Sequence, residues 1–155
     1  MNQISRLEGL TSQSQLERLV LYGNQIARIE GLGSLTRLKE LQINRNKLTD
    51  SLHYLADVPN IGSTLETLNA SHNLIPETEI ENVCSLIGEL GNLKTLELYG
   101  NPLAQKDSYK YRVCGSSASL ERLDGLNMKA GSFLRQRLDQ LKTEWETTRL
   151  VESTH

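Results

Sequence analysis

Cysteine and histidine are scarce in this sequence and glycine-rich phosphate-binding motifs are absent, which excludes several kinds of site. Two cysteines and three histidines occur among 155 residues, and none of them has the spacing of a metal site or of a nucleophile with its base. No glycine-rich motif that cradles phosphates is present. We therefore expect no catalytic residue, no cofactor and no metal ion, and we predict that the chain is not an enzyme.

An excess of charge of one sign and long apolar runs are also absent. Lysine and arginine number 17 against 19 acidic residues, so the chain lacks the basic excess that neutralises nucleic-acid phosphates. No apolar run approaches the roughly 20 residues that span a bilayer, and residues 1–4 do not resemble a signal peptide. Two cysteines are too few for a disulfide framework. We expect a cytoplasmic protein that binds no nucleic acid and does not insert into membranes.

Leucine is abundant, and it recurs at a fixed spacing. The pattern Leu-x-x-Leu-x-Leu-x-x-Asn, with Ile or Ala in place of one leucine in two copies, occurs four times and ends at Asn24, Asn46, Asn73 and Asn101. Asn2 falls where a preceding half repeat has the same position. Successive asparagines are 22, 22, 27 and 28 residues apart. Self-similarity at such a period is the signature of a leucine-rich-repeat solenoid.

The spacing predicts an α/β fold, namely a right-handed leucine-rich-repeat solenoid with a short parallel concave β-sheet, convex loops and short helices, and a C-terminal cap and helix. Residues two apart point to the same face of a strand, so the paired leucines face the core and the residues between them face outward. We assign residues 1–128 to the solenoid, with the cap at about 102–128, and residues 129–155 to the C-terminal helix and tail.

The asparagine at each strand end lies where the chain turns sharply. Its amide can bond backbone groups that the turn would leave unpaired in the interior. As a functional feature, the row of amides would be a ligand ladder, but the repeat needs this residue whatever the protein binds. We therefore interpret the row as a structural ladder formed by Asn2, Asn24, Asn46, Asn73 and Asn101.

The end of the array carries a resemblance to a known family. It holds the series Asn101-Pro102-Leu103, Tyr109, Tyr111-Arg112, Leu120, Leu123 and Asp124-Gly125. This series is similar to the C-terminal capping motif of the 22-residue class of leucine-rich repeats, and the resemblance covers roughly residues 2 to 128. That class includes the regulatory subunit 7 type of protein phosphatase 1 regulators, the leucine-rich light chain of outer-arm axonemal dynein, and axonemal assembly and centrosomal factors. The resemblance implies that the cap covers the last open strand.

Three segments are predicted to be helical. Residues 77–90 place apolar side chains at helical spacing and acids at the N-terminal end, where the helix dipole favours them. Residues 50–61 have apolar steps of three, which favours a short or 3₁₀ helix. The helix predicted for residues 129–151 either packs back on the cap or projects toward a partner or a second copy of the chain. Its apolar stripe consists of Leu134, Leu138, Leu141 and Trp145.

The outward strand positions form the candidate binding face. Tyr22 and Tyr99 stand near its two ends as amphipathic anchors, and Arg45 and His72 form its rim. The middle is a shallow polar floor, and the alternative interpretation is that the face is only a solvated sheet surface. The outward residues are Arg18, Val20, Tyr22, Glu40, Gln42, Asn44, Thr67, Asn69, Ser71, Thr95, Glu97 and Tyr99.

Two functions from different classes follow from this fold. In the first, the concave face docks a segment of a protein partner of unknown identity, and the chain is a non-catalytic scaffold or adaptor. In the second, the domain is structural or oligomerising, and it self-associates through its C-terminal helix or its open N-terminal edge. The family resemblance implies a setting in phosphatase regulation or in the cilium, flagellum or cytoskeleton.

Overall fold

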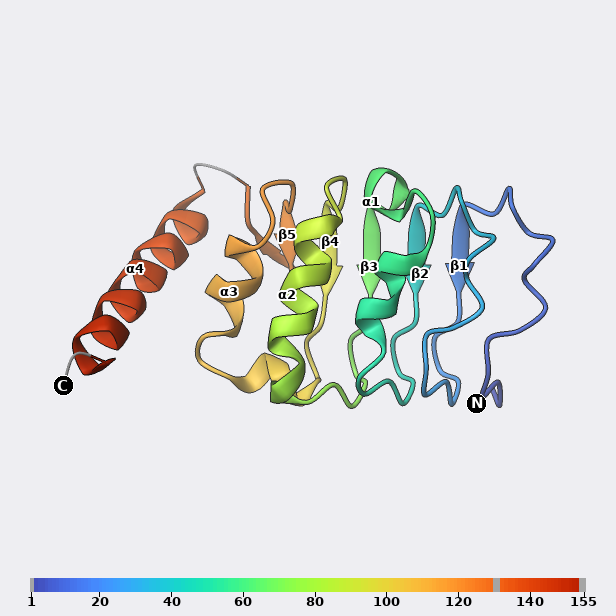
Figure 1. Ribbon diagram of the computed structural model, residues 1–155, viewed down its shortest axis with the longest axis horizontal. Helices are drawn as coiled ribbons and strands as arrows, with labels where there is room; N and C mark the ends of the chain where they lie inside the picture. Colours follow the sequence, from blue (N-terminus) through green and yellow to red (C-terminus); the bar gives the residue numbers. More distant parts are fainter. Residues whose placement is uncertain (1, 130–131, 154–155) are drawn as a thin grey trace.

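The computed structural model of the chain describes residues 2–129 and 132–153, without the side chains of Trp145 and residues 149–153. Within these residues, six short strands form one sheet and lie in the order of the sequence (Figure 1). The first five run parallel, and the sixth pairs antiparallel with the fifth. Their bounds are β1 (Arg18–Val20), β2 (Glu40–Gln42), β3 (Thr67–Asn69), β4 (Thr95–Glu97), β5 (Arg122–Leu123) and β6 (Leu126–Asn127).

The parallel strands are in register at their central leucines. A shift of one residue would turn these leucines to solvent and bring polar neighbours into the core, so the register is strongly specified. Except for Leu19, the central leucines are fully buried. The predicted parallel sheet with leucines facing inward is therefore confirmed. The aligned residues are Leu19, Leu41, Leu68, Leu96 and Leu123.

Short helices lie across the core from the sheet (Figure 1). The 3₁₀ helix predicted within residues 50–61 and the helix predicted for residues 77–90 are both present, and the second begins with a 3₁₀ turn. The longer third and fourth repeats provide the residues for these helices. The bounds are η1 (Leu52–Asp57), α1 (Ile61–Thr64), η2 (Glu77–Glu79), α2 (Ile80–Glu89), η3 (Pro102–Gln105) and α3 (Tyr109–Gly115).

The C-terminal helix α4 (Phe133–Ser153) stands at the end of the array beyond α3 (Figure 1). It begins at Phe133, whereas the sequence predicts a start at Lys129. The Ser132 hydroxyl oxygen accepts the backbone N–H of Arg135 at 3.1 Å, which is the bond of an N-capping residue. The cap therefore sets the start of the helix after Ser132.

The first half of α4 packs on the cap. Leu138 is buried, and Leu134 and Leu141 are partly buried against the core. Nη2 of Arg135 donates to the backbone oxygen of Ser117 at 2.9 Å, which joins the start of α4 to the segment after α3. The sequence left open whether the helix packs on the cap or projects from it, and these contacts favour packing on the cap. The fourth residue of the stripe, Trp145, has its side chain outside the described part of the chain.

The first repeat is less completely buried than the others. Leu16, Leu19 and Leu21 are partly exposed, while their counterparts in the second repeat are fully buried. Residues 2–4 pair with the turn after β1, where the N–H of Gln25 donates to the carbonyl oxygen of Ile4 at 2.8 Å. No strand of the described chain lies beside the other edge of β1, so its backbone groups face solvent there.

We predict that residues 2–15 exchange their amide hydrogens faster than residues 93–103. Few buried apolar contacts and unpaired strand edges give low local opening free energies. Hydrogen exchange followed by mass spectrometry, on protein shown to be monomeric by light scattering, measures this difference. Equal protection of the two segments in the monomer would contradict the open-edge interpretation.

The cap closes the other end of the array. Four of its side chains are buried, namely Tyr111, Val113, Leu120 and Leu123. The sequence did not predict β6, which folds back on β5 through the turn at residues 124–125 and occupies its free edge. The last parallel strand is therefore covered by backbone pairing as well as by apolar side chains.

We predict that Leu123→Ala lowers the free energy of unfolding by about 2 to 5 kcal/mol, because Leu123 is fully buried and truncation leaves a cavity. Urea unfolding of the full chain measures the change. Leu74→Ala is the matched control, since Leu74 is 54% exposed and its truncation is expected to cost within about 0.5 kcal/mol. Similar losses in the two variants would show that the cap does not stabilise the array.

Candidate protein-binding face

A ladder of asparagines fixes the ends of the strands from which this face is built. Each ladder asparagine accepts a backbone N–H of the preceding repeat on Oδ1, at 2.9 to 3.1 Å. Its Nδ2 donates to a carbonyl at the end of its own strand, and in the later repeats also to one in the preceding repeat. One amide thus satisfies groups in two repeats, which confirms the structural interpretation for Asn24, Asn46, Asn73 and Asn101, all of them buried.

Asn2 does not belong to this ladder, and its prediction was wrong. Its side chain is exposed, and its backbone N–H donates to the carbonyl oxygen of Gly23 at 3.2 Å. No strand of the described chain ends beside it, so no buried turn requires its amide. The repeat spacing alone does not distinguish this position from a buried one.

Asp124 follows β5 directly and bonds backbone groups just after β4. Its Oδ1 accepts the backbone N–H groups of Leu98 and Tyr99 at 2.7 and 3.1 Å, and its Oδ2 accepts the hydroxyl proton of Tyr109 at 2.8 Å. A carboxylate can accept at both oxygens, whereas an amide has a nitrogen that only donates. Burial, followed by the neighbouring Asp124 carboxylate, raises the pKa of Tyr109 well above its ordinary value of 10.0.

We predict that the stabilising contribution of Tyr109 is lost progressively as the pH rises above 10. The folded state keeps the phenol proton that the unfolded state loses there, so the contribution of Tyr109 is complete below pH 10 and falls by about 1.4 kcal/mol per pH unit above it. Urea unfolding at several alkaline pH values measures the slope. Tyr109→Phe is expected to be less stable than the parent at neutral pH and to have a shallower alkaline slope. Identical slopes in the two proteins would contradict this assignment.

Most of the predicted face residues lie on the solvent side of the sheet. Val20, Tyr22 and Tyr99 are 42%, 54% and 43% exposed, and Arg18 is also exposed. Half-buried residues form the floor between them, and they are Glu40, Gln42, Asn44, Thr67, Asn69, Thr95 and Glu97. The floor therefore offers parts of polar side chains to a ligand, while the large accessible groups stand at its ends.

Ser71 was predicted to be exposed on this face, and that prediction was wrong. It is fully buried, and its hydroxyl donates to Oδ1 of Asn69 at 2.7 Å. The next residue, His72, stands edge-on to the Tyr99 ring of the following repeat, with 5.0 Å between ring centroids. A small serine beside this pair has no room to reach solvent. The floor next to Tyr99 is therefore lower than the alternation of residues predicts.

The charges of the floor are partly neutralised. Nε of Arg18 bonds and pairs with Oε2 of Glu40, which also accepts Nε2 of Gln42 at 3.3 Å. Glu97, at the equivalent position of β4, is half-buried. The face thus carries no strong charge of one sign, and its two tyrosines are the residue type that most often dominates binding energy.

The residue before each ladder asparagine has left-handed backbone. The φ angles are +74° for Gly23, +56° for Arg45, +53° for His72 and +78° for Gly100. The sequence did not reveal that an arginine and a histidine adopt the same conformation as the two glycines. Arg45 and His72 are both exposed at the strand ends beside the face.

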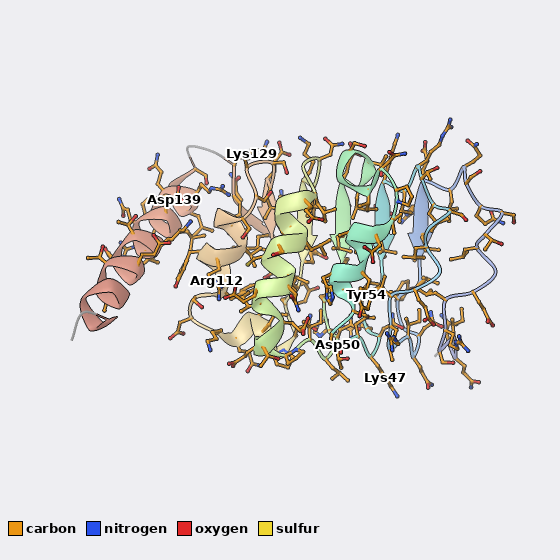
Figure 2. All side chains as sticks on the ribbon, in the orientation of Figure 1. Lys47, Asp50, Tyr54, Arg112, Lys129 and Asp139 are labelled. Carbon is orange, nitrogen blue, oxygen red and sulfur yellow. The ribbon has the colours of Figure 1, made fainter. Side chains whose placement is uncertain are left out.

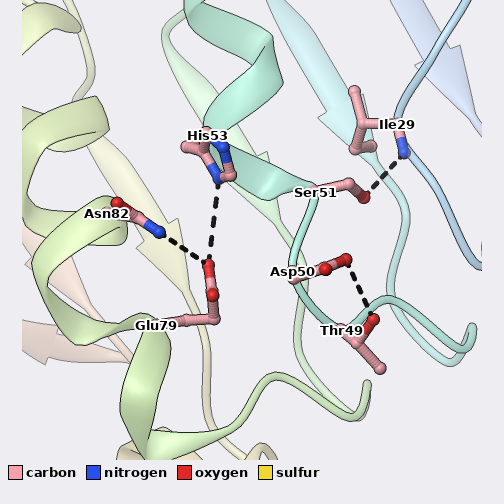
Figure 3. Close-up of polar contacts among 7 residues, drawn as sticks. All are labelled: Ile29, Thr49, Asp50, Ser51, His53, Glu79 and Asn82. Atoms are coloured by element: carbon pink, nitrogen blue, oxygen red, sulfur yellow. Dashed lines mark hydrogen bonds and ion pairs between the residues drawn. The ribbon is translucent and has the colours of Figure 1, made fainter.

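Polar contacts on the helix-bearing side join successive repeats (Figure 3). Nδ1 of His53 lies 3.8 Å from Oε2 of Glu79, which also accepts Nδ2 of Asn82 at 3.2 Å. The buried hydroxyl oxygen of Ser51 accepts the N–H of Ile29 at 2.9 Å, so it does for this turn what asparagine does at the strand ends. We assign these contacts a structural role. A single serine carries no repeat signal, so the sequence did not reveal Ser51.

The two cysteines are free thiols in different environments. Cys114 is buried, and burial raises the pKa of its thiol, which disfavours the reactive thiolate. Cys84 is half-buried. Among the described residues, no group of three or more His, Cys, Asp or Glu side chains is placed to hold a metal ion. No helix in residues 2–129 and 132–153 has the length and apolar character needed to cross a membrane.

Known proteins resemble the chain mainly in structure. The family model described as Leucine Rich repeats (2 copies) matches residues 14–55, and no curated protein matches the chain in sequence. A solved structure of the Drosophila melanogaster SNF/U2A′ complex has a TM-score of 0.75 and 24% identity, covering 96% of this chain and 82% of that one. The Mex67 leucine-rich-repeat domain of Chaetomium thermophilum has a TM-score of 0.51 and 22% identity, covering 66% and 64%.

A third solved structure shares the same architecture. An internalin from Listeria monocytogenes has a TM-score of 0.53 and 26% identity, covering 79% of this chain and 38% of that one. With the repeats and the sheet described above, these likenesses show that the chain has a leucine-rich-repeat fold. Solenoids of this kind present an extended concave surface that is used for binding.

Proposed function

We propose that the chain is a non-catalytic scaffold or adaptor that binds a segment of a protein partner on the solvent side of its sheet. The observation that carries this proposal is the placement of two exposed tyrosines, Tyr22 and Tyr99, on either side of a low polar floor. Tyrosine supplies a large apolar area with a polar tip and is enriched at binding hot spots. Both residues lie in turns just after a strand, where backbone hydrogen bonds between repeats order the chain, so binding orders little that is not already ordered.

The spacing of the tyrosines fits an α-helical segment. They stand three strands apart, which is about 14 Å at the usual strand separation of about 4.8 Å. An α-helix with its side chains is about 10 to 12 Å wide. The buried Ser71 and the half-buried Asn44 lower the floor between the tyrosines. One helix lying along the strands would therefore contact both rings.

The likenesses support a protein partner and a choice of cellular settings. One matched solved structure is a complex of two proteins, SNF and U2A′. The repeat class and cap motif support a role in phosphatase regulation or in attachment to the cilium, flagellum or cytoskeleton, and with it a cytoplasmic location. A co-purification of the full chain from ciliated cells, with the tyrosine variants below as controls, distinguishes these settings.

Self-association through the first repeat is the second candidate function. The partly exposed Leu16, Leu19 and Leu21 and the open edge of β1 favour it, because unpaired edges and apolar ends pair readily with another chain. Light scattering over a range of protein concentrations tests it. A molar mass that stays at 17.4 kDa excludes this function and leaves the sheet face as the site.

We predict that Tyr22→Ala and Tyr99→Ala each weaken partner binding by about 1 to 3 kcal/mol, because each removes an exposed anchor without disturbing the core. The probes are helix-forming peptides selected from a displayed library on the purified full chain, with affinities measured by calorimetry. Circular dichroism of each variant is expected to match the parent.

The matched control is Tyr54→Ala. Tyr54 is 41% exposed, like Tyr99, but it lies on the helix-bearing side (Figure 2). Its truncation is expected to leave the affinity within about twofold, which is the usual limit for residues outside hot spots. If the double variant lacking Tyr22 and Tyr99 bound the peptides as tightly as the parent, the sheet face would not be the site, and α4 around Trp145 would become the first candidate.

A further inference from the structure

The turn before the ladder asparagines has a backbone conformation that glycine adopts without strain. All four residues at this position have positive φ, and two of them are glycines. A Cβ added at Gly23 would meet no atom within 4 Å, so the turn does not require a side chain there. For L-residues other than glycine, asparagine and aspartate, the left-handed conformation is unfavourable. The backbone conformation by itself would therefore favour glycine at positions 45 and 72.

His72 is held in place by its neighbours in the next repeat. Its ring meets Tyr99 edge-on at 5.0 Å and lies over Gly100, where an added Cβ would come within 2.6 Å of Nδ1. The glycine at position 100 thus leaves the space that the histidine ring fills. His72 is in this way oriented beside one of the two tyrosine anchors before any partner binds.

Arg45 stands one repeat away, at the equivalent position after β2. Its backbone N–H donates to the carbonyl oxygen of Ser71 at 3.0 Å, which places it about one strand separation, roughly 5 Å, from His72. Its side chain is exposed, and no hydrogen bond or ion pair of its guanidinium occurs among the residues that the structure describes. A guanidinium binds carboxylates with two parallel hydrogen bonds.

We propose that Arg45 and His72 are specificity-determining residues that bind an acidic side chain of the protein segment held between Tyr22 and Tyr99. The four turn positions beside the face contain two donors and two glycines and no carboxylate. Gly23 leaves room beside Arg45, since an added Cβ there would meet no atom within 4 Å. The complementary group is therefore a carboxylate of glutamate or aspartate on the partner. This inference rests on the proposed function and adds the chemistry of the partner.

The test uses the full chain and two synthetic peptides. Both are alanine-based helices with leucine anchors, and they differ only in carrying glutamate or glutamine at the position facing the rim. Binding is followed by amide chemical shifts in two-dimensional NMR spectra. We expect the parent to bind the glutamate peptide about tenfold more tightly at low salt, as charge-assisted hydrogen bonds allow. The preference should disappear in the Arg45→Gly, His72→Gly double variant.

Lys47→Ala is the matched control for charge. Lys47 is an exposed cation two residues after Arg45, at the edge where the strands end (Figure 2). It is expected to keep the preference for the glutamate peptide. A loss of preference as large as that in the double glycine variant would mean that net charge and not the rim selects the partner, and would overturn the proposal.

Thermal unfolding separates a recognition role from a structural one. Arg45→Gly is expected to melt at the same temperature as the parent or higher, because glycine relieves the left-handed conformation and the exposed Arg45 side chain makes no hydrogen bond or ion pair with the described residues that would be lost. His72→Gly also loses the ring contact with Tyr99, so its melting temperature is not the criterion. A lower melting temperature in Arg45→Gly would show that its side chain supports the fold, and would overturn the argument. A double variant that kept the preference would overturn it as well.

The remaining outcomes distinguish this inference from the proposed function. If the parent bound both peptides equally and the Tyr22→Ala, Tyr99→Ala double variant bound neither, the rim proposal would fail and the sheet face would stand. If neither peptide moved any amide signal of the parent at millimolar concentration, both proposals would fail. A glutamate preference abolished by the glycine variants, with intact folding, supports both.

Discussion

The hydrogen bonds of the buried asparagine amides are the interaction on which the rest of the structure depends. Each repeat must reverse direction beneath the sheet, and a reversal in the interior leaves backbone groups that water cannot reach. Asn46 satisfies backbone groups of two turns, since its Oδ1 accepts the N–H of Ile26 and its Nδ2 donates to the carbonyl oxygens of Leu21 and Ile43. Successive repeats are therefore joined by shared polar groups as well as by leucine packing. A buried amide left without partners would cost about 1 to 3 kcal/mol per group, so the position of each asparagine relative to its own strand tolerates little change.

The same turns decide which side chains a partner can meet. The backbone N–H of Arg45 must reach the carbonyl oxygen of Ser71, and that of His72 must reach Tyr99, while the following asparagine enters the core. These bonds hold the intervening residue in the left-handed region, and its side chain then lies outside. A constraint of folding thereby creates one exposed position per repeat at the edge of the sheet. Where that position is glycine the edge is open, and where it is Arg45 or His72 the edge carries a donor.

The sequence predicted the features that repeat and missed those that occur once. The leucine spacing gave the parallel sheet, and the apolar steps in residues 50–61 and 77–90 gave the helices, because each rests on several residues with one period. Burial of Ser71 depends on His72 and Tyr99, which meet only when two repeats stack. The bond between Tyr109 and Asp124 joins positions 15 residues apart in the cap, where the period has already ended. Single contacts between stacked repeats leave no periodic signal, so reasoning from one sequence cannot reach them.

One face of the sheet stabilises the fold and the other is free for recognition. This separation explains how such a fold carries a binding site with little loss of stability. The inward positions are fully buried leucines in β2 to β5, so the stability of the array is nearly independent of what stands outward. The outward positions can then be chosen for recognition. Most of them here are half-buried polar residues with little area to offer, and Arg18 and Glu40 largely satisfy each other. Discrimination among partners is therefore left to the few large side chains that stand above this floor, and the closely placed Tyr99 and His72 are the pair that the stacking of repeats orients before binding.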